Sequence, residues 1–219
     1  MEKRIGFVGC YSHDVILMLA KLLCCMEKRV LIRDRNQKHT LRASVPVPEG
    51  LCARKAVVEY NGFFFTEQDM KREMSGDYEI EIVDFGTEGI REEIALCSDV
   101  VVVTDMLLHH IRCVEEIGLP KELLRFCIVR DSVEALCIGE NEIERFLQGF
   151  SRNRCFFLPP DFRDVKNRYV CETLHEYNIT RASPEMQEAI YGIAEVLCPG
   201  YGEKELRRMV KRWEKRRYR

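Results

Sequence analysis

The sequence predicts an α/β fold: a doubly wound, mostly parallel central sheet with helices on both faces. Short apolar runs alternate with longer segments of helical spacing along the 219 residues, and this alternation is typical of βαβ units. Some short runs, such as Val100–Val103, are apolar at every position, as in strands buried on both sides. Ligands of such folds gather at the carboxyl ends of the strands. Here these ends follow Val8, Ile32, Val83 and Val103.

The expected strands are short runs rich in β-branched and aromatic residues. They cover residues 5–8, 29–34, 78–85, 99–104, 126–130 and 155–158. Phe63–Phe65 fits either a short strand or a buried loop. The stretch 36–59 contains Pro46, Pro48 and Gly50 and is the least regular part of the chain.

The expected helices cover residues 15–26, 88–96, 107–117, 138–150, 184–198 and 203–217. The first is apolar almost all round, which predicts a helix pressed into the core. A length of 219 residues makes one core the default. We therefore expect an α/β domain over residues 1–202 and a basic amphipathic C-terminal helix over residues 203–219.

Composition excludes several classes of protein. Hydrophobic residues make up 46% and charged residues 32% of the chain, which excludes fibrous and wholly disordered proteins. No apolar run reaches the roughly 18–20 residues of a membrane span, and Met1–Arg4 leads directly into a strand without an apolar signal core. We expect a cytoplasmic protein.

Eleven cysteines are present, and no Cys-x-x-Cys pair occurs among them. Their wide spacing and their positions inside apolar runs predict reduced structural thiols rather than a local metal-binding cluster of cysteines. His109 and His110 are neighbours on a predicted helix and point in different directions, which argues against a metal shared between them. His13, His39 and His175 are expected to be surface or hydrogen-bonded residues. We predict no catalytic residue and no metal site.

The segment between the first strand and the first helix stands where a phosphate-binding loop would stand. Such a loop needs several glycines, a Lys for the phosphates and a Ser or Thr for magnesium. Here only Gly9 is present, and no Lys occurs between Arg4 and Lys21. Asp14 lies near the helix N-terminus, where its carboxylate would repel a triphosphate. This pattern favours a capped turn without a ligand.

From Lys3 to about Leu197 the sequence resembles the deviant Walker ATPases of the ParA/MinD type. Lys3–Gly9 resembles their opening strand, and Arg29–Asp34 resembles the second strand, whose terminal Asp lies beside the phosphates. Tyr78–Gly86 resembles the Walker B strand, and Ser98–Thr104 resembles the strand that follows it. The resemblance implies a P-loop NTPase-like fold and places Asp84 at the magnesium-linked position.

Two later passages also resemble the family. Phe126–Asp131 matches the strand after which an Asn often reads the base, a position that Arg130 or Asp131 takes here. Phe157–Asp161 resembles the loop that closes over the base. The positions assigned to a degenerate nucleotide pocket are Gly9, Cys10, Tyr11, Ser12, His13, Asp14, Asp34, Asp84, Arg130 and Pro160. Asp34 and Asp84 have a second interpretation, because an Asp at a strand end often caps the next turn.

The C-terminal segment is basic and amphipathic. Leu206, Met209, Val210 and Trp213 form one apolar stripe at helical spacing. From Glu203 onward the charge is +6, against −2 for the whole chain. The residues assigned to surface binding are Arg207, Arg208, Lys211, Arg212, Trp213, Lys215, Arg216 and Arg217. Such a helix suits an anionic membrane surface or an acidic partner, and the alternative is that its stripe packs on the domain.

Three functions remain open. The first is a ParA/MinD-like pseudo-ATPase that acts as a scaffold or localisation factor; the resemblance implies a link to envelope machinery such as a pilus-assembly or secretion complex. In this case no cofactor is expected, the partners are proteins, and a peripheral position at the inner face of the membrane is open. The second is an active ATPase with an atypical phosphate loop, which would bind ATP with magnesium. The third is a nucleic-acid binder working through the basic tail, which the acidic body disfavours. Family members dimerise across nucleotide, so homodimerisation stays open.

Overall fold

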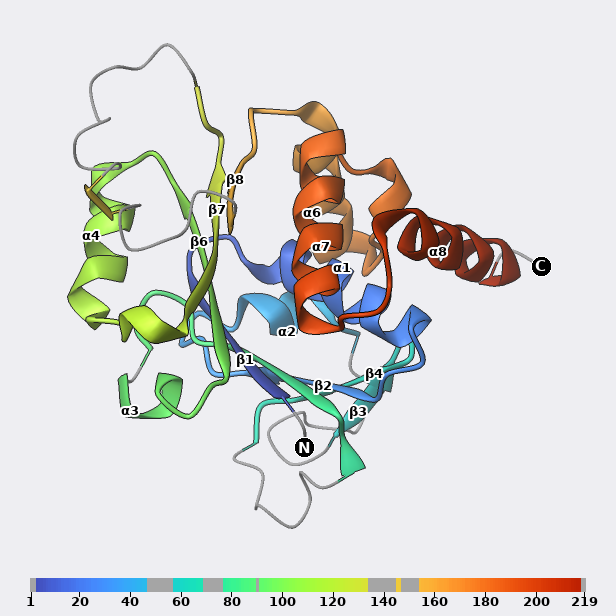
Figure 1. Ribbon diagram of the computed structural model, residues 1–219, viewed down its shortest axis with the longest axis horizontal. Helices are drawn as coiled ribbons and strands as arrows, with labels where there is room; N and C mark the ends of the chain where they lie inside the picture. The colour runs from blue at the N-terminus through green and yellow to red at the C-terminus, as the bar shows by residue number, and fades with distance from the viewer. Residues whose placement is uncertain are drawn as a thin grey trace.

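The computed structural model describes residues 3–46, 57–68, 77–89, 91–133, 145–146 and 154–217. At its centre is an eight-stranded sheet in the order β3-β4-β2-β5-β1-β6-β7-β8 (Figure 1). All neighbouring strands pair in parallel except β3 and β4, which form an antiparallel pair at one edge. The predicted α/β fold with a mostly parallel sheet is therefore confirmed.

The strands are β1 Lys3–Gly9, β2 Val30–Asp34, β3 Val58–Tyr60, β4 Phe63–Thr66, β5 Ile80–Asp84, β6 Asp99–Asp105, β7 Leu124–Arg130 and β8 Cys155–Phe157. The six expected strands are all present, and Phe63–Phe65 forms a strand rather than a loop. Strand β3 was not predicted. It lies within the stretch that the sequence marks as least regular.

The helices are α1 His13–Cys25, α2 Thr40–Ser44, α3 Arg91–Ile94, α4 Leu108–Ile117, α6 Phe162–Leu174, α7 Pro184–Leu197 and α8 Glu203–Arg217. Two 3₁₀ turns cover Lys121–Leu123 and Ile179–Arg181. The helix predicted over 138–150 lies mostly outside the described residues. Within that range the structure describes only residues 145 and 146, and both are helical.

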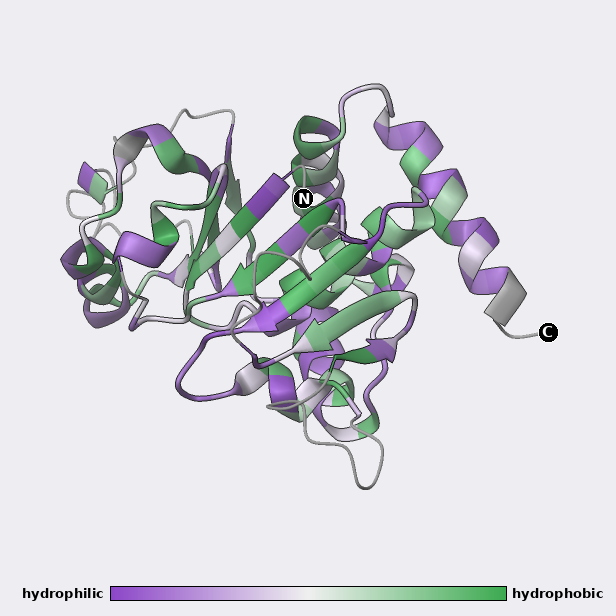
Figure 2. Ribbon diagram, turned by 90° about the horizontal axis from the view of Figure 1, so that it is seen from below, coloured by the Kyte–Doolittle hydropathy of each residue, from purple (hydrophilic) through white to green (hydrophobic). Residues whose placement is uncertain are grey.

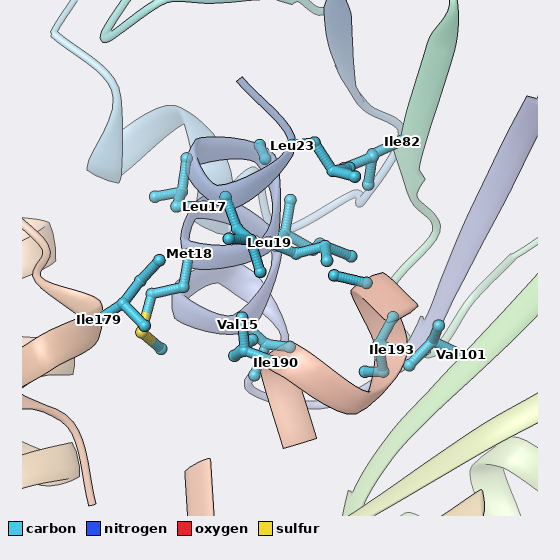
Figure 3. Packing of buried hydrophobic residues seen from close by; sticks show 14 of the residues in the cluster. Val15, Leu17, Met18, Leu19, Leu23, Ile82, Val101, Ile179, Ile190 and Ile193 are labelled. Atoms are coloured by element: carbon cyan, nitrogen blue, oxygen red, sulfur yellow. The ribbon is translucent and has the colours of Figure 1, made fainter. Parts of the chain in front are cut away.

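Helices lie on both faces of the sheet, as Figure 1 shows, with α3 and α4 on one side and α1, α6 and α7 on the other. Helix α1 is the centre of the larger core, and its residues from His13 to Leu23 are all buried. In Figure 3, Ile190 and Ile193 of α7 lie on one side of α1, and Ile82 of the sheet lies on another. Helix α1 is apolar on almost every side, as the sequence predicted, and other elements pack against it on every side.

Helix α6 was not predicted because its amphipathicity is inverted. Its buried residues are Asp164, Asn167 and Cys171, whereas its exposed apolar residues are Phe162, Val165, Tyr169 and Leu174. The Asp164 carboxylate accepts bonds from the backbone N–H (2.8 Å) and the hydroxyl (2.6 Å) of Ser183. Polar groups of α6 therefore fix the start of α7, and no apolar stripe faces the core.

Helix α8 packs its apolar stripe on the domain. Leu206 and Val210 are fully buried in the larger core, and Met209 packs against it. Figure 2 shows hydrophobic and hydrophilic residues alternating along this helix. Of the two interpretations left open for the stripe, the structure has the packed one. Among the described residues, no helix has both the length and the apolar character needed to cross a bilayer.

Candidate functional site

The carboxyl ends of the central strands meet at one edge of the sheet, as expected. The turn after β1 begins at Gly9, whose φ of +118° is in the region that favours glycine. A Cβ at Gly9 would lie 1.9 Å from the Val103 carbonyl oxygen, so a side chain cannot fit here. The N–H of Cys10 donates to the same carbonyl at 2.9 Å. The close approach of β1 and β6 thus fixes where this loop starts.

A buried ion pair fills the N-terminal end of α1. The Arg130 guanidinium, at the end of β7, donates to both carboxylate oxygens of Asp14, at 2.7 and 2.8 Å. It also donates to the Tyr11 carbonyl at 2.8 Å. Asp14 and Arg130 are 1% and 2% exposed. Three residues assigned to the pocket therefore come together, but they bind one another.

The charge of this pair is strongly fixed. Burial acts to raise the pKa of Asp14, but the charge and hydrogen bonds of Arg130 hold that pKa below its ordinary value. Burial likewise acts to lower the pKa of Arg130, and Asp14 raises it. An ionised carboxylate at a helix N-terminus satisfies the positive end of the helix dipole. An incoming phosphate would meet this negative charge and an arginine that is already engaged.

Asp84 forms a second buried cluster. Its carboxylate accepts bonds from the Ser12 hydroxyl (3.1 Å), the Gly86 N–H (3.1 Å) and the Asn36 amide (3.3 Å). Burial raises the pKa of Asp84, and these three hydrogen bonds oppose the rise. A Ser or Thr of the phosphate loop and a Walker B Asp hold magnesium in P-loop NTPases, so the contact between Ser12 and Asp84 has the residue types of that arrangement.

Asp34 lies beside this cluster, since it pairs with Asp84 across β2 and β5. Its carboxylate accepts the N–H groups of Asn36 (3.0 Å) and Arg42 (3.1 Å), so it also closes the turn after β2. Burial, and then the nearby Asp84 charge, raise the pKa of Asp34 to about 7. Asn36 donates hydrogen bonds to both Asp34 and Asp84. It was not predicted as a site residue, because nothing in the sequence alone distinguishes it.

The cavities beside these residues differ greatly in volume. The cavity bounded by Arg130, Asp131, Pro159 and Asp161 measures about 10 Å³, roughly what one water molecule needs. Pro160 is exposed in the neighbouring loop. A cleft of about 380 Å³ opens beside Asp34 and is bordered by Glu67, Glu88 and Glu93 as well. This cleft is acidic, which disfavours a phosphate there.

A cleft of about 400 Å³ lies away from the strand ends, between α6 and α8. Within it the Lys21 ammonium donates to the Tyr177 carbonyl (3.2 Å) and lies 4.6 Å from the Trp213 ring centre. Lys21 is the first lysine after the loop, and it is buried against the C-terminal helix. It is therefore part of the packing of α8 and does not reach the strand ends.

The histidines occupy separate environments. The His13 ring is buried, with Nε2 3.2 Å from a Glu172 carboxylate oxygen, and the His39 ring is near Glu67. His109 is exposed. His110 instead faces back to the sheet, where its Nδ1 lies 2.8 and 2.9 Å from the two carboxylate oxygens of Asp105.

Cys10 lies beside this Asp105–His110 pair. Its thiol, one carboxylate oxygen and one imidazole nitrogen all lie within 4.8 Å of one another. Burial, and then the Asp105 charge, raise the pKa of Cys10 to about 12, so the group is a thiol rather than an activated nucleophile. The sequence placed Cys10 in the pocket, but it gave no sign of Asp105 or His110.

The basic side chains of α8 are divided between partners and solvent. Arg207 is paired with Glu203 (2.6 Å) and donates to the Gln187 side-chain oxygen (2.8 Å). Arg208, Lys211, Arg212 and Lys215 are exposed. The side chains of Arg216 and Arg217 are outside what the structure describes. An exposed basic face therefore exists on a helix whose apolar face is covered.

Comparison with solved structures identifies the fold. A ParA family ATPase from Chlorobium tepidum TLS superimposes with a TM-score of 0.56 and 14% identity, over 89% of this chain and 99% of that one. A chain of the MinC:MinD cell division protein complex of Aquifex aeolicus matches with a TM-score of 0.61 and 12% identity, over 91% of this chain and 98% of that one. Apo McdA of Cyanothece matches with a TM-score of 0.61 and 12% identity, over 90% and 100%.

The chain therefore has the fold of the ParA/MinD-type P-loop NTPases. The similarity extends over nearly the full length of both partners, and the predicted fold resemblance is confirmed. No protein-family model matches the sequence, and no curated protein matches it. At identities of 10–14% the likeness concerns the fold, and the chemistry must be argued from this chain's own residues.

Proposed function

We propose that this protein is a ParA/MinD-like pseudo-ATPase that acts as a scaffold or localisation factor. The observation that carries the proposal is the bidentate ion pair between Asp14 and Arg130. It occupies the helix N-terminus at which a P-loop NTPase binds phosphate. Phosphoryl transfer depends on cations and N–H donors aimed at the phosphates, and the arginine nearest to this position is neutralised by Asp14.

Two further features support the loss of nucleotide binding. The loop between Gly9 and Asp14 has a single glycine and no lysine. The cavity beside Arg130 and Pro159 is about 10 Å³, far too small for a nucleobase. We therefore expect neither ATP nor GTP to bind tightly.

The exposed face of α6 supports a role through protein contacts. Phe162, Val165 and Tyr169 follow one another at helical spacing and are 79%, 47% and 68% exposed. Apolar side chains grouped on a surface mark contact sites more often than scattered ones do. One structural neighbour is a complex of MinD with MinC, and we propose a protein partner for this chain too, in envelope machinery such as a pilus-assembly or secretion complex.

The basic face of α8 gives a second contact of the scaffold. With its apolar stripe buried, we propose that this face attracts an anionic membrane surface or an acidic protein by charge alone. DNA is another candidate partner, because a further structural neighbour is pNOB8 ParA bound to nonspecific DNA. The acidic remainder of this chain makes nucleic acid the weaker candidate. Homodimerisation remains open in this proposal.

An active ATPase with an atypical loop is the second candidate, and the hydrogen bond between Ser12 and Asp84 favours it. Isothermal titration of the full chain with magnesium-ATP and magnesium-GTP separates the two. The pseudo-ATPase gives no saturable heat with either nucleotide. A dissociation constant in the micromolar range, lost in Asp84→Asn and kept in the control Asp99→Asn, would establish the ATPase instead. Asp99 is a suitable control because it lies at the opposite end of the sheet, paired with Arg125.

The scaffold role is tested by position in the cell. We expect a fluorescent fusion of the full chain to collect at discrete sites and the variant Val165→Ser/Tyr169→Ser to spread evenly. Val196→Ser is the matched control, because Val196 is exposed to a similar degree (42%) on α7. An even distribution of the unmodified protein, or unchanged sites in the α6 variant, would count against localisation through α6.

A further inference from the structure

We propose that Cys10, Asp105 and His110 form a binding site for a transition-metal dication, and that Zn²⁺ fits it best. The three residues come from three elements that meet at the carboxyl edge of the sheet. Cys10 follows β1, Asp105 ends β6, and His110 lies in the first turn of α4. Figure 1 shows α4 beside β6. The site is separate from the Asp84 cluster, where Ser12 and Asn36 are bound.

The donor atoms are already close to the spacing that a metal needs. The imidazole nitrogen and the carboxylate oxygen are 2.8 Å apart, and all three donors lie within 4.8 Å of one another. Zinc bonds of about 2.0–2.3 Å place neighbouring ligand atoms of a tetrahedron roughly 3.3–3.8 Å apart. Side-chain rotations that move the donor atoms by about 1 Å therefore bring all three to these distances.

The chemistry of the donors selects the metal class. Sulfur, nitrogen and oxygen from one Cys, one His and one Asp match the borderline-soft preference of zinc, whereas magnesium and calcium prefer oxygen alone. A thiolate and a carboxylate supply two negative charges, which balance a dication. The hydrogen bond between His110 and Asp105 holds two of the donors together, and a bound metal replaces its proton.

The surroundings allow an ion to enter and a fourth ligand to bind. Asp105 is 7% exposed, whereas Cys10 and His110 are partly exposed, the His110 side chain at 19%. The Tyr11 ring, 50% exposed, lies edge-on to the His110 ring at 6.1 Å. The positive charge of Arg130 acts on Cys10, and the pairing of Arg130 with Asp14 reduces its repulsion of a dication. Three protein ligands and one solvent-accessible position are typical of open zinc sites.

Asp105 has a structural task that survives metal binding. Its Oδ1 accepts the Leu107 N–H at 2.9 Å and so closes the turn that leads into α4. This bond fixes the direction of the carboxylate, as the partners of metal ligands commonly do. The variant Asp105→Asn can keep this turn bond through its amide oxygen while it weakens the metal site.

The test uses the full chain, freed of metal by a chelator and held reduced, and titrated with zinc against a chromophoric zinc indicator. We expect one equivalent per chain with saturable binding. Cys10→Ser and His110→Gln should each lower the zinc affinity by about 100-fold or more. The reason is that losing a residue that merely hydrogen-bonds a metal ligand already costs about 10–100-fold, and these two variants remove a ligand itself. The controls Cys113→Ser and His109→Gln change neighbouring residues of α4 and should bind as the unmodified chain does. Thermal melts establish that each variant is folded.

Cobalt supplies the second measurement. A thiolate-to-cobalt charge-transfer band should appear in the unmodified chain and in Cys113→Ser, and should be absent in Cys10→Ser. The proposal is overturned if no zinc binds. It is also overturned if Cys10→Ser and Cys113→Ser bind equally, which would be adventitious binding by thiols. Rapid alkylation of Cys10 at neutral pH, unchanged by zinc, would indicate a reactive cysteine instead of a metal site.

Discussion

The ion pair between Asp14 and Arg130 makes a quantitative prediction about stability. Both side chains are almost completely buried and share two hydrogen bonds. Removal of one member of such a pair leaves a buried charge, which typically costs about 3–5 kcal/mol of unfolding free energy. We expect a loss of this size for Asp14→Leu and for Arg130→Met, out of a total of about 5–15 kcal/mol for an ordinary domain.

The double variant separates the pair from its surroundings. With both charges gone, the Tyr11 carbonyl loses its Arg130 donor and the Val15 N–H loses its Asp14 acceptor, at a cost of about 1–3 kcal/mol for each neutral group. Asp14→Leu/Arg130→Met should therefore be more stable than either single variant, with a coupling energy of roughly 3 kcal/mol or more. Urea unfolding followed by far-ultraviolet circular dichroism measures all four proteins.

An exposed pair of the same types is the control. Arg163 contacts Asp161 at 2.6 Å on the surface, so Arg163→Met should change stability little. The pH dependence gives a further check. Because the folded pKa of Asp14 lies below the ordinary 3.8, the contribution of the pair is complete above that value and is lost as the pH falls through the folded pKa. The reasoning would be refuted if each single variant lost little stability and the double variant lost only the sum of the two. The ion pair would then be weak, and it would no longer argue against a nucleotide at this loop.

Three more predictions follow from buried groups. Since the folded pKa of Asp34 is raised to about 7, the protein should become more stable to urea as the pH falls from 7 towards 4. Asp34→Asn should reduce that dependence, and the remainder should come from Asp84, whose pKa is also raised. A flat profile in the unmodified protein would contradict this prediction. Leu206→Ala should lower the unfolding free energy by about 2–5 kcal/mol, as measured by urea titration. Arg208→Gln, which changes an exposed side chain of the same helix, should leave that free energy unchanged. If the two variants lowered it equally, α8 would not be part of the core. Under reducing conditions, alkylation and mass measurement should find all eleven cysteines free after unfolding and most of them protected before it; a persistent disulfide would contradict this.

Six of the strands could be predicted from the sequence because each is a short run rich in apolar residues, whereas β3 has no such run. The same argument placed Asp34 and Asp84 at one edge, since parallel strands end together. The pair of Asp14 and Arg130 could not be predicted, because the residues are 116 positions apart and an Arg after a strand has no fixed partner. Helix α6 was missed for a different reason, since periodicity assumes that the apolar side of a helix faces inward.

The proximity of Asp105 and His110 shows a similar limit. Their spacing of five residues would place them on different faces of a continuous helix. They meet because Asp105 ends a strand and His110 begins a helix, with the chain turning between them. Only the exact position of that turn decides which side chain faces back to the sheet, and a boundary read from sequence is uncertain by two or more residues.

The seating of α8 on α1 has a consequence for how the chain folds. Leu206 and Val210 belong to the same core as Val15 and Leu19, so α1 completes its packing with a segment that comes far later in the sequence. The Lys3 ammonium adds another long connection to the Leu197 carbonyl, across 194 residues. Contacts of such separation form late, because the loop they close is costly in entropy. During synthesis the apolar surface of α1 stays without its full cover until α8 has been made and has docked, and a partly folded chain exposes that surface to aggregation.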